Sequence, residues 1–283
     1  MANGNRRTLI SSLRRVAREI RGSIMPAHVT REFTGVSLVL DYEFRKLRTD
    51  RDHAFLQRAA RGHRLVYDVG ANVGLAALLI APELEANGRI VCFEPSEDAC
   101  RVLASHAALN PSRNGVTINV VNALIGELPS ETVDYFWQSH SGGASIIAGF
   151  LDNIGRGATK IAKASISLDS YATARSEKPD FLKIDVEGAE LSVLRGMRRI
   201  LTEVGPTIVV EIHGWKDTPL AENAARIVEF LETVDYAFIY PPDRRATTDV
   251  RPLYANRGRA HALLQPKARE VPGWLDEIDT SNL

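Results

Sequence analysis

A charged run follows the apolar residues Phe181 and Leu182, at the point where a buried strand would end. The run contains Lys183, Asp185 and Glu187, and these three share one side because side chains alternate along a strand. Burying such charges is costly unless they are paired, so their position favours a functional site. The alternative is a Lys183–Asp185 ion pair that only orders the following loop.

A second apolar run ends in Glu211 and His213, which share one face by the same alternation. Because histidine titrates near neutral pH, His213 is a candidate general base, with a purely structural histidine as the alternative. Asp185 and Glu187 are further candidate bases. Lys183 joins them if burial lowers its pKa.

Three carboxylates at these two strand ends also offer the oxygen ligands that Mg²⁺ prefers. They are Asp185, Glu187 and Glu211. The two alternatives are a magnesium site that orients a substrate and a metal-free site in which a carboxylate acts as the base.

A glycine-containing loop lies between an apolar run and a helical pattern, and it reads Asp68-Val69-Gly70-Ala71-Asn72-Val73-Gly74. Glycine lets the backbone turn tightly and approach a ligand, and the start of a helix offers free amide donors. The loop is not the dinucleotide-binding fingerprint, because Asn72 occupies the place of its second glycine. A P-loop is excluded as well, since no Lys-Ser/Thr pair follows.

Glu94 follows the next apolar run, with Pro95 directly after it. A carboxylate in this place accepts two hydrogen bonds from a ribose diol. In open α/β sheets ligands bind beyond the carboxyl ends of the strands, so the loop and Glu94 predict a site for a nucleotide-like ligand. The alternative is a tight strand–helix turn with a surface glutamate.

Strands that alternate with helices must position these side chains. Apolar runs predict the strands, and helical spacing of apolar residues predicts the helices. Their alternation indicates an α/β fold with βαβ units and a doubly wound, mostly parallel sheet. The expected strands are 65–69, 89–93, 116–121, 181–186, 207–212, 237–240 and 260–264, and the expected helices are 75–84, 189–201, 220–233 and one that Ser96 caps and that runs to about 109.

The pattern divides the chain into three parts. Residues 1–64 form a basic, helical N-terminal extension with 14 Lys/Arg and 6 Asp/Glu, residues 65–266 form the ligand-binding domain, and residues 267–283 form a tail. Within the domain, residues 127–178 break the rhythm and predict an insertion of short strands and loops between the third and fourth core strands. In the extension we expect a short strand over 33–40 and a short helix over 51–61.

Residues 6–25 carry one apolar stripe at helical spacing, and arginines occupy much of the remaining surface. One interpretation is a helix packed on the body of the protein with a solvated basic face. The other is peripheral contact with an anionic membrane or an acidic partner.

The composition is that of an ordinary globular protein, with 35 basic and 35 acidic side chains and a formal net charge of zero. Because nucleic-acid binders are usually strongly basic, we expect no nucleic-acid partner. The sequence has no apolar run as long as a membrane span and starts without a secretion signal. Cys92 and Cys100 lack metal-ligand spacing, which indicates a reducing compartment, so we expect a cytoplasmic protein.

Together the motifs resemble the FkbM-type S-adenosylmethionine-dependent methyltransferases over about residues 65–240. The resemblance implies the Rossmann-like class I methyltransferase fold, a seven-stranded sheet with a reversed last strand. Its most specific part is Lys183–Glu190. The segments that carry it are Asp68–Gly74, Phe93-Glu94-Pro95, Ala123-Leu124-Ile125-Gly126, Leu168-Asp169-Ser170, Lys183–Glu190, Leu194-Arg195-Gly196 and Glu211–His213.

The same resemblance implies roles for several residues. Asp68 and the loop Gly70–Gly74 would hold the methionine part of S-adenosylmethionine, and Glu94, with Pro95 beside it, would bind the ribose hydroxyls. Ala123 would flank the adenine, and Asp185 would lie near the sulfonium and the acceptor. Acceptors in the family are hydroxyl groups on sugars, glycolipid-like signals and polyketides, which implies O-methylation of a small-molecule or glycan acceptor.

Two other functions compete with a carbohydrate or natural-product O-methyltransferase. The first is a non-catalytic binding protein that keeps the fold, which the intact loop and both cofactor acids disfavour. The second is a nucleic-acid methyltransferase, prompted by the basic extension. The acidic remainder of the chain and the lack of an Asn/Asp-Pro-Pro-Tyr-type motif disfavour it.

Overall fold

The computed structural model describes residues 26–128, 132–137, 144–145, 159–214, 218–254, 258–281 and 283. The chain separates into two compact units, Met1–Arg48 and Thr49–Leu283. The expected basic helix over 6–25 lies outside the described residues, so it and its membrane contact stay predictions.

The described part of the smaller unit is a β-hairpin. Strands β1 (His28–Phe33) and β2 (Val36–Asp41) pair antiparallel, and the 3-10 turn η1 (Tyr42–Phe44) follows. Thr34 and Gly35 connect the strands with φ angles of 41° and 82°, the left-handed pair that a tight two-residue hairpin turn requires. The prediction of one strand over 33–40 is therefore wrong, because this turn falls inside it.

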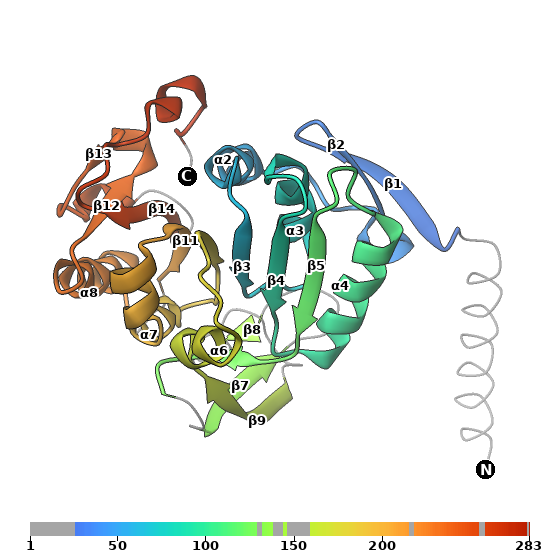
Figure 1. The fold of residues 1–283 in the computed structure, drawn as a ribbon, viewed down its shortest axis with the longest axis horizontal. Helices are drawn as coiled ribbons and strands as arrows, with labels where there is room; N and C mark the ends of the chain where they lie inside the picture. Colours follow the sequence, from blue (N-terminus) through green and yellow to red (C-terminus); the bar gives the residue numbers. More distant parts are fainter. Residues whose placement is uncertain are drawn as a thin grey trace, which may run out of the picture. The chain divides into compact units, whose positions relative to one another are not determined.

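The larger unit is built on a sheet of eight strands within the described residues, in the order β13-β12-β14-β11-β10-β3-β4-β5 (Figure 1). The core strands β3, β4, β5, β10 and β11 pair parallel, and β14 runs antiparallel to both of its neighbours. This confirms the mostly parallel seven-stranded class I arrangement with a reversed last strand, to which the short β13 adds an edge. The strands are β3 (Leu65–Val69), β4 (Arg89–Phe93), β5 (Thr117–Val121), β10 (Phe181–Ile184), β11 (Thr207–His213), β12 (Tyr236–Tyr240), β13 (Arg245–Ala246) and β14 (Arg259–Pro266).

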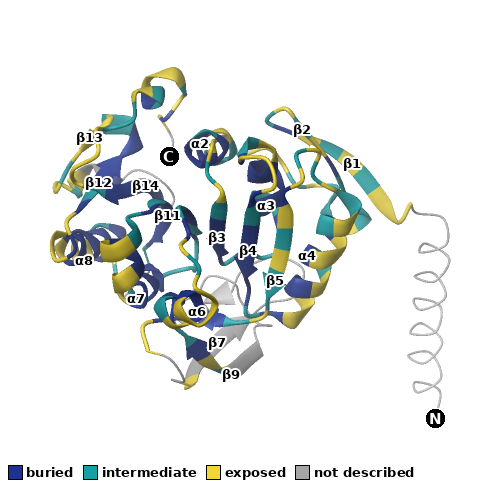
Figure 2. Cartoon of the chain, in the orientation of Figure 1, coloured by how far each residue is buried: buried dark blue, intermediate teal, exposed yellow. Residues whose placement is uncertain are grey.

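Helices cover both faces of this sheet, and Figure 2 shows its central strands β3 and β4 as mostly buried. Val66 and Phe181 face one helix layer, and their neighbours Tyr67 and Leu182 face the other. The first layer holds α2 (Arg51–Ala60), α3 (Leu75–Ile80) and α4 (Glu97–Leu109), and the second holds α6 (Leu168–Arg175), α7 (Glu190–Arg195) and α8 (Leu220–Glu232).

Several helix ends have clear local causes. Ser96 caps α4 as expected, because its side chain accepts a hydrogen bond from the amide of Ala99 at 3.2 Å. The helix expected over 75–84 ends at Ile80 and continues as the 3-10 turn η2 (Ala81–Glu83), which contains a proline. The helix expected over 189–201 is interrupted after α7, and a π-helical turn, η3 (Ile200–Val204), follows. The C-terminal part adds three 3-10 turns, η4 (Pro241–Asp243), η5 (Arg251–Tyr254) and η6 (Gly273–Glu277).

A second, four-stranded sheet occupies the region between β5 and β10. Its order is β6-β9-β7-β8, from β6 (Leu124–Ile125), β7 (Thr132–Trp137), β8 (Ala144–Ser145) and β9 (Thr159–Ile166). Helix α6 also lies in this region, where the sequence predicts only strands and loops. The amide of Ser170 donates to the side chain of Ser167 at 3.2 Å, a capping contact that starts this helix.

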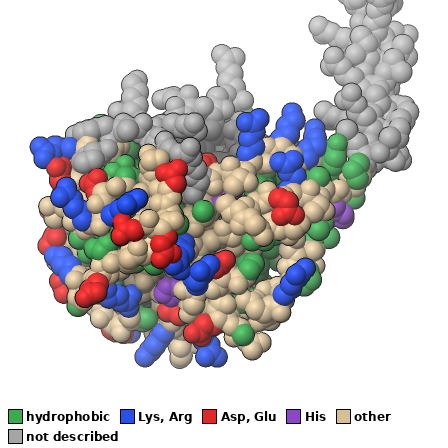
Figure 3. Space-filling model, turned by 90° about the horizontal axis from the view of Figure 1, so that it is seen from above, with side chains coloured by type: hydrophobic (Ala, Val, Ile, Leu, Met, Phe, Trp, Pro, Cys, Tyr) green, Lys and Arg blue, Asp and Glu red, His purple; other side chains and the backbone are tan. Residues whose placement is uncertain are grey.

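Three features of the described residues concern possible partners: surface charge, helix hydrophobicity and the two cysteines. On the face shown in Figure 3, basic and acidic side chains are interspersed over the described body of the protein. Among the described residues, no helix combines the length and the apolar character that crossing a bilayer requires. Cys92 and Cys100 are buried free thiols.

Candidate active site

The loops that follow β3, β4, β10 and β11 meet at one edge of the sheet, because these neighbouring strands run parallel. Lys183 on β10 is in register with Asp68 on β3 and with Val209 on β11. The four segments that the sequence marks for chemistry therefore come together at the carboxyl ends of the strands.

The glycine loop after β3 is fixed by its neighbours. The amides of Gly70 and Ala71 both donate to the carbonyl oxygen of Phe93 on β4, at 3.0 and 3.1 Å. Gly70 has a φ of 77°, and a Cβ atom there would overlap the carbonyl oxygen of Asp185. Its lack of a side chain thus allows the loops after β3 and β10 to approach each other.

The rest of the loop also needs special backbone angles. Asn72 has a φ of 47°, a left-handed conformation that asparagine tolerates better than most residues. Gly74 has a φ of 87°, and a Cβ atom there would lie 2.8 Å from Cγ of Leu103 on α4. Asparagine can therefore occupy the position at which a dinucleotide-binding loop has its second glycine.

Asp68 is fully buried at the end of β3. Neither of its carboxylate oxygens has a hydrogen-bond partner among the described residues. Burial raises the pKa of Asp68, and the ammonium of Lys183, 3.5 Å away, opposes this. A buried carboxylate without donors is costly, so Asp68 is suited to a ligand that brings a cationic N–H group.

Glu94 is also buried, and each of its oxygens accepts one backbone hydrogen bond. The amide of Asn72 donates to Oε2 at 2.9 Å, and the amide of Ser96 donates to Oε1 at 2.8 Å. Burial raises the pKa of Glu94, and these two amides oppose the shift. Because each oxygen keeps a further lone pair, Glu94 can still accept two donors from a diol.

Pro95 and Ala123 follow the ends of the neighbouring strands β4 and β5. The carbonyl oxygen of Pro95 accepts hydrogen bonds from Lys163 Nζ at 2.7 Å and from the Asn122 side chain at 3.0 Å. The amide of Ala123 donates to the carbonyl oxygen of Val121 at 2.9 Å. Since Lys163 belongs to β9, the second sheet is tied directly to this part of the site.

Lys183 is held by three oxygens. Its Nζ atom lies 3.1 Å from the carbonyl oxygen of Gly70, 3.1 Å from Oδ2 of Asp185 and 3.5 Å from Oδ1 of Asp68. Burial lowers the pKa of Lys183, but the two carboxylates outweigh burial and raise it overall. The condition under which Lys183 would serve as a base, a pKa lowered by burial, is therefore not met.

His213 lies within a ring of carboxylates at the end of β11. Its Nδ1 donates to Oε1 of Glu190 at 2.8 Å, and its Nε2 lies 3.5 Å from Glu187, 3.6 Å from Glu211 and 3.9 Å from Asp185. Burial lowers the pKa of His213, but Glu190 and the other carboxylates outweigh it and raise the value to about 10. The expectation that His213 titrates near neutral pH is therefore wrong, because a protonated imidazole has no lone pair to accept a proton.

Glu187 has an unusual backbone conformation and a raised pKa. It has a φ of 53°, a left-handed conformation that is strained for a side chain of this type. Burial raises its pKa to about 7, Asp185 and Glu211 add to this, and the cation of His213 opposes it. Its side chain remains 29% exposed, so a substrate can reach it.

The residues expected to bind Mg²⁺ lie in a cluster that already contains positively charged side chains. Ligand atoms of Asp185, Glu211 and His213 lie within 4.8 Å of one another, so His213 stands where the sequence suggests Glu187. Glu211 accepts a hydrogen bond from Arg259 Nη1 at 2.5 Å, and Asp185 faces Lys183. The proposed Mg²⁺ site of Asp185, Glu187 and Glu211 stays a prediction.

Sequence reasoning missed four charged or polar partners of this cluster. Glu190 and Asn223 contact His213, while Arg259 and His261 contact Glu211. Glu190 and Asn223 leave one signal, since each is a polar residue on the buried face of a helix. Arg259 and His261 lie on the reversed strand, and only its pairing with β11 brings them here.

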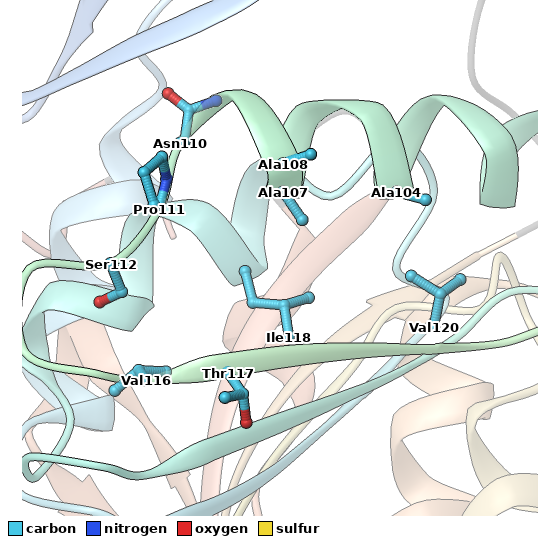
Figure 4. Close-up of a pocket in the computed structure, with 10 residues that line it drawn as sticks. All are labelled: Ala104, Ala107, Ala108, Asn110, Pro111, Ser112, Val116, Thr117, Ile118 and Val120. Carbon is cyan, nitrogen blue, oxygen red and sulfur yellow. The ribbon is translucent and has the colours of Figure 1, made fainter.

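A separate groove of about 370 Å³ lies between α4 and β5 (Figure 4). Ala104 and Ala107 line it from the helix, and Ile118 and Val120 line it from the strand. None of the candidate site residues lines this groove. The candidate active site is thus the charged cluster at the strand ends.

Comparison with known proteins identifies the family. The model of the methyltransferase FkbM domain matches residues 68–238, which span the site from the glycine loop to β12. The chain belongs to the FkbM methyltransferase family. This domain is an S-adenosylmethionine-dependent methyltransferase domain of the FkbM type, as the motifs predict.

Relatives of this FkbM methyltransferase differ widely in length. AMB antimetabolite synthetase AmbE of Pseudomonas aeruginosa is 27% identical, and the match covers 68% of this chain but 11% of AmbE. Hexuronic acid methyltransferase AglP of Haloferax volcanii is 26% identical, over 65% of this chain and 71% of AglP. The crystal structure of methyltransferase FkbM from Methylobacillus flagellatus is 18% identical, covers 80% of this chain and 46% of its own, and has a TM-score of 0.42.

The residues of this FkbM methyltransferase fit S-adenosylmethionine. The oxygens of Asp68 accept no hydrogen bond among the described residues, which suits an ammonium group, and the spare lone pairs of Glu94 suit a diol. Asp185 and Glu187 add negative charge at the end of the neighbouring strand β10. The residues expected to bind S-adenosylmethionine therefore lie at one edge of the sheet. They offer hydrogen-bond acceptors that suit its ammonium and ribose groups.

Proposed function

We propose that this protein transfers a methyl group from S-adenosylmethionine to a hydroxyl group of a carbohydrate, glycolipid or natural-product acceptor, with Glu187 as the general base. The observation that carries the proposal is the environment of Glu187. It is the one carboxylate of the cluster whose pKa is raised to about 7, and it is partly exposed. A base is most effective when its pKa lies near the working pH.

A hydroxyl acceptor suits this cluster because a hydroxyl is both a donor to carboxylates and a weak nucleophile. It gains by losing its proton as the bond to carbon forms, and an adjacent base removes that proton. The name of the relative AglP, a hexuronic acid methyltransferase, supports a carbohydrate acceptor.

The residues divide the work among binding, positioning and proton transfer. Bound S-adenosylmethionine supplies an electrophilic methyl carbon and a neutral thioether leaving group. In our proposal Asp68 binds its ammonium group, Glu94 binds its ribose diol, and Ala123 lies beside its adenine. Lys183 holds Asp185 and the carbonyl oxygen of Gly70 in fixed positions, because it bonds both.

Glu187 then accepts the acceptor proton at a carboxylate oxygen. His213 stays protonated, so its positive charge stabilises the ionised form of Glu187 before the transfer. A positioned base of this kind contributes about 10²- to 10⁴-fold in rate. In our proposal the second sheet, which Lys163 ties to Pro95, also shapes the acceptor pocket.

The test begins with a screen of neutral hexoses, hexuronates, glycolipids and polyketide alcohols, measured as S-adenosylhomocysteine formation. For any acceptor found, Glu187→Gln should lower kcat by about 10²-fold or more and leave the Kd for S-adenosylmethionine within about threefold of wild type. Glu229→Gln, an exposed change on α8, is the matched control. Equal kcat in Glu187→Gln and wild type would refute the base assignment.

Binding of S-adenosylmethionine without transfer to any acceptor class would favour the non-catalytic alternative. Methylation of RNA or DNA in the same assay would contradict the expected absence of a nucleic-acid partner.

A further inference from the structure

Glu190 has no role in the proposed reaction so far, although it is a carboxylate without exposed surface next to the site. It is the first residue of α7 and comes three residues after Glu187. An ionised side chain at such a position is costly to bury unless donors surround it. Its surroundings therefore need a reason.

Three donors converge on the Glu190 carboxylate. Oε1 accepts hydrogen bonds from the amide of Gly188 and from Nδ1 of His213, both at 2.8 Å, and Oε2 accepts one from Nδ2 of Asn223 at 3.2 Å. The Asn223 side chain also donates to the carbonyl oxygen of His213 at 2.9 Å. One carboxylate thus joins the turn after β10, the end of β11 and the first turns of α8.

The Gly188 contact bears directly on the candidate base. Glu187 and Gly188 have φ angles of 53° and 103°, so the turn that presents Glu187 uses two left-handed residues in succession. Such a turn persists only when the surrounding structure holds it. The hydrogen bond from the Gly188 amide to Glu190 is a restraint of this kind.

The His213 contact orients the imidazole that faces the base. Because Nδ1 is bonded to Glu190, Nε2 points toward the carboxylates of Glu187, Asp185 and Glu211. The charged groups around the ring come from every neighbouring element. Asp185 and Glu187 belong to the turn after β10, Glu211 to β11 and Glu190 to α7, with Lys183 behind Asp185 and Arg259 behind Glu211.

We propose that Glu190 is a positioning residue for methyl transfer, which fixes the Gly188 amide and the His213 ring and so holds Glu187 toward the acceptor. This rests on the proposed function, in which Glu187 is the base. Glu190 acts through Glu187, and it contacts neither the donor nor the acceptor. A carboxylate is needed because it accepts three hydrogen bonds at once, which neither an apolar side chain nor an amide can do.

The experiment is a double-mutant cycle on the full chain, with Glu187→Gln, Glu190→Gln and the double variant. Glu190→Gln keeps the shape of the side chain but presents an NH₂ group to Asn223, so it should lower kcat about 10-fold and leave KM for S-adenosylmethionine within about twofold. In the Glu187→Gln background the same change should lower kcat by less than about twofold, because the base is already absent. Glu222→Gln, an exposed change in the first turn of α8, is the control and should change neither constant.

Asn223→Ala provides a second route if Glu190→Gln fails to fold. It removes one of the three donors and should lower kcat in the same direction, again only when Glu187 is present. A drop in kcat that persists in the Glu187→Gln background, or an unchanged kcat in a folded Glu190→Gln protein, overturns the proposal. The kcat of Glu187→Gln alone tests the proposed base, so an unchanged value would refute the base and, with it, the positioning role. The comparison of Glu190→Gln with the double variant tests the positioning role separately.

Discussion

Lys183 donates a hydrogen bond to the carbonyl oxygen of Gly70 across 3.1 Å, and so connects β10 with the glycine loop after β3. The same ammonium lies between the carboxylates of Asp68 and Asp185. The donor-binding loop and the acidic turn therefore share one buried cation. Its removal would leave the buried Asp68 without its counter-charge and would weaken the pairing of Asp185.

Lys183→Met should consequently destabilise the protein. Breaking a buried ion pair by deleting one partner costs about 3–5 kcal/mol, because the remaining charge stays buried. The free energy of unfolding, measured by urea denaturation, is the readout. Lys178→Met, at an exposed position just before β10, is the control and should change it by less than about 0.5 kcal/mol. Equal free energies of unfolding in the two variants would show that the ion pairs of Lys183 do not stabilise the folded protein.

Glu94→Ala should weaken binding of S-adenosylmethionine. Loss of charge-assisted hydrogen bonds costs about 1.5–3 kcal/mol, or roughly 10- to 100-fold in Kd. The variant also frees the amides of Asn72 and Ser96, which adds to the loss. Calorimetry with Glu97→Gln, an exposed acid in the next helix, supplies the comparison. Undiminished affinity in Glu94→Ala would show that Glu94 does not bind the ribose of S-adenosylmethionine.

The rate of methyl transfer should rise with pH through about 7. Glu187 must be ionised to accept a proton, and its pKa is about 7, so kcat should increase about tenfold per unit below pH 6 and level off above pH 8. The cation of His213 lowers the pKa of Glu187. His213→Gln should therefore shift the inflection of the kcat profile to higher pH. An inflection that stays in place in this variant contradicts the electrostatic link between the two residues.

His213 should also make stability depend on pH. Its pKa is about 10 in the folded protein and 6.5 in the unfolded chain, so the folded state binds this proton more tightly. The resulting stabilisation is complete below pH 6.5 and is lost as the pH rises through about 10, with a slope of up to about 1.4 kcal/mol per unit. Urea titrations of wild type and His213→Gln between pH 6.5 and 9.5 measure it. Parallel slopes in the two proteins would rule out a raised pKa.

Chelation separates the two alternatives for the carboxylate cluster. His213, Lys183 and Arg259 already place positive charge beside Asp185 and Glu211, so we expect turnover to be unchanged after EDTA treatment. Loss of turnover that Mg²⁺ restores would instead assign a metal to Asp185, Glu187 and Glu211. Turnover assays before and after dialysis against EDTA decide the matter.

Local patterns in the sequence predict the sheet well. The strands over 65–69 and 89–93 agree with the structure residue for residue, because continuous apolar runs end in charged residues where the sheet meets the site. The side chains at these strand ends also come together as expected, because their strands are parallel neighbours in the sheet. The hairpin turn at Thr34 escapes prediction because threonine gives little sign of a positive φ.

The electrostatics of the site could not be predicted in the same way. The pKa of Lys183 depends on Asp68, which lies on another strand, and the pKa of His213 depends on Glu190, which lies on a helix. A pattern shows that charges are present, whereas the direction of each shift follows from which partner folding brings closest. The raised pKa values of Lys183 and His213 both have this cause.

Gly70 carries a consequence for the design of such proteins. Because a methyl group there would overlap the backbone of Asp185, any replacement for the loop after β3 or β10 must preserve this close approach. A chimaera that receives a new turn after β10 must therefore match the glycine loop at this contact. In this fold the sequence of one loop therefore limits which turns can follow the neighbouring strand.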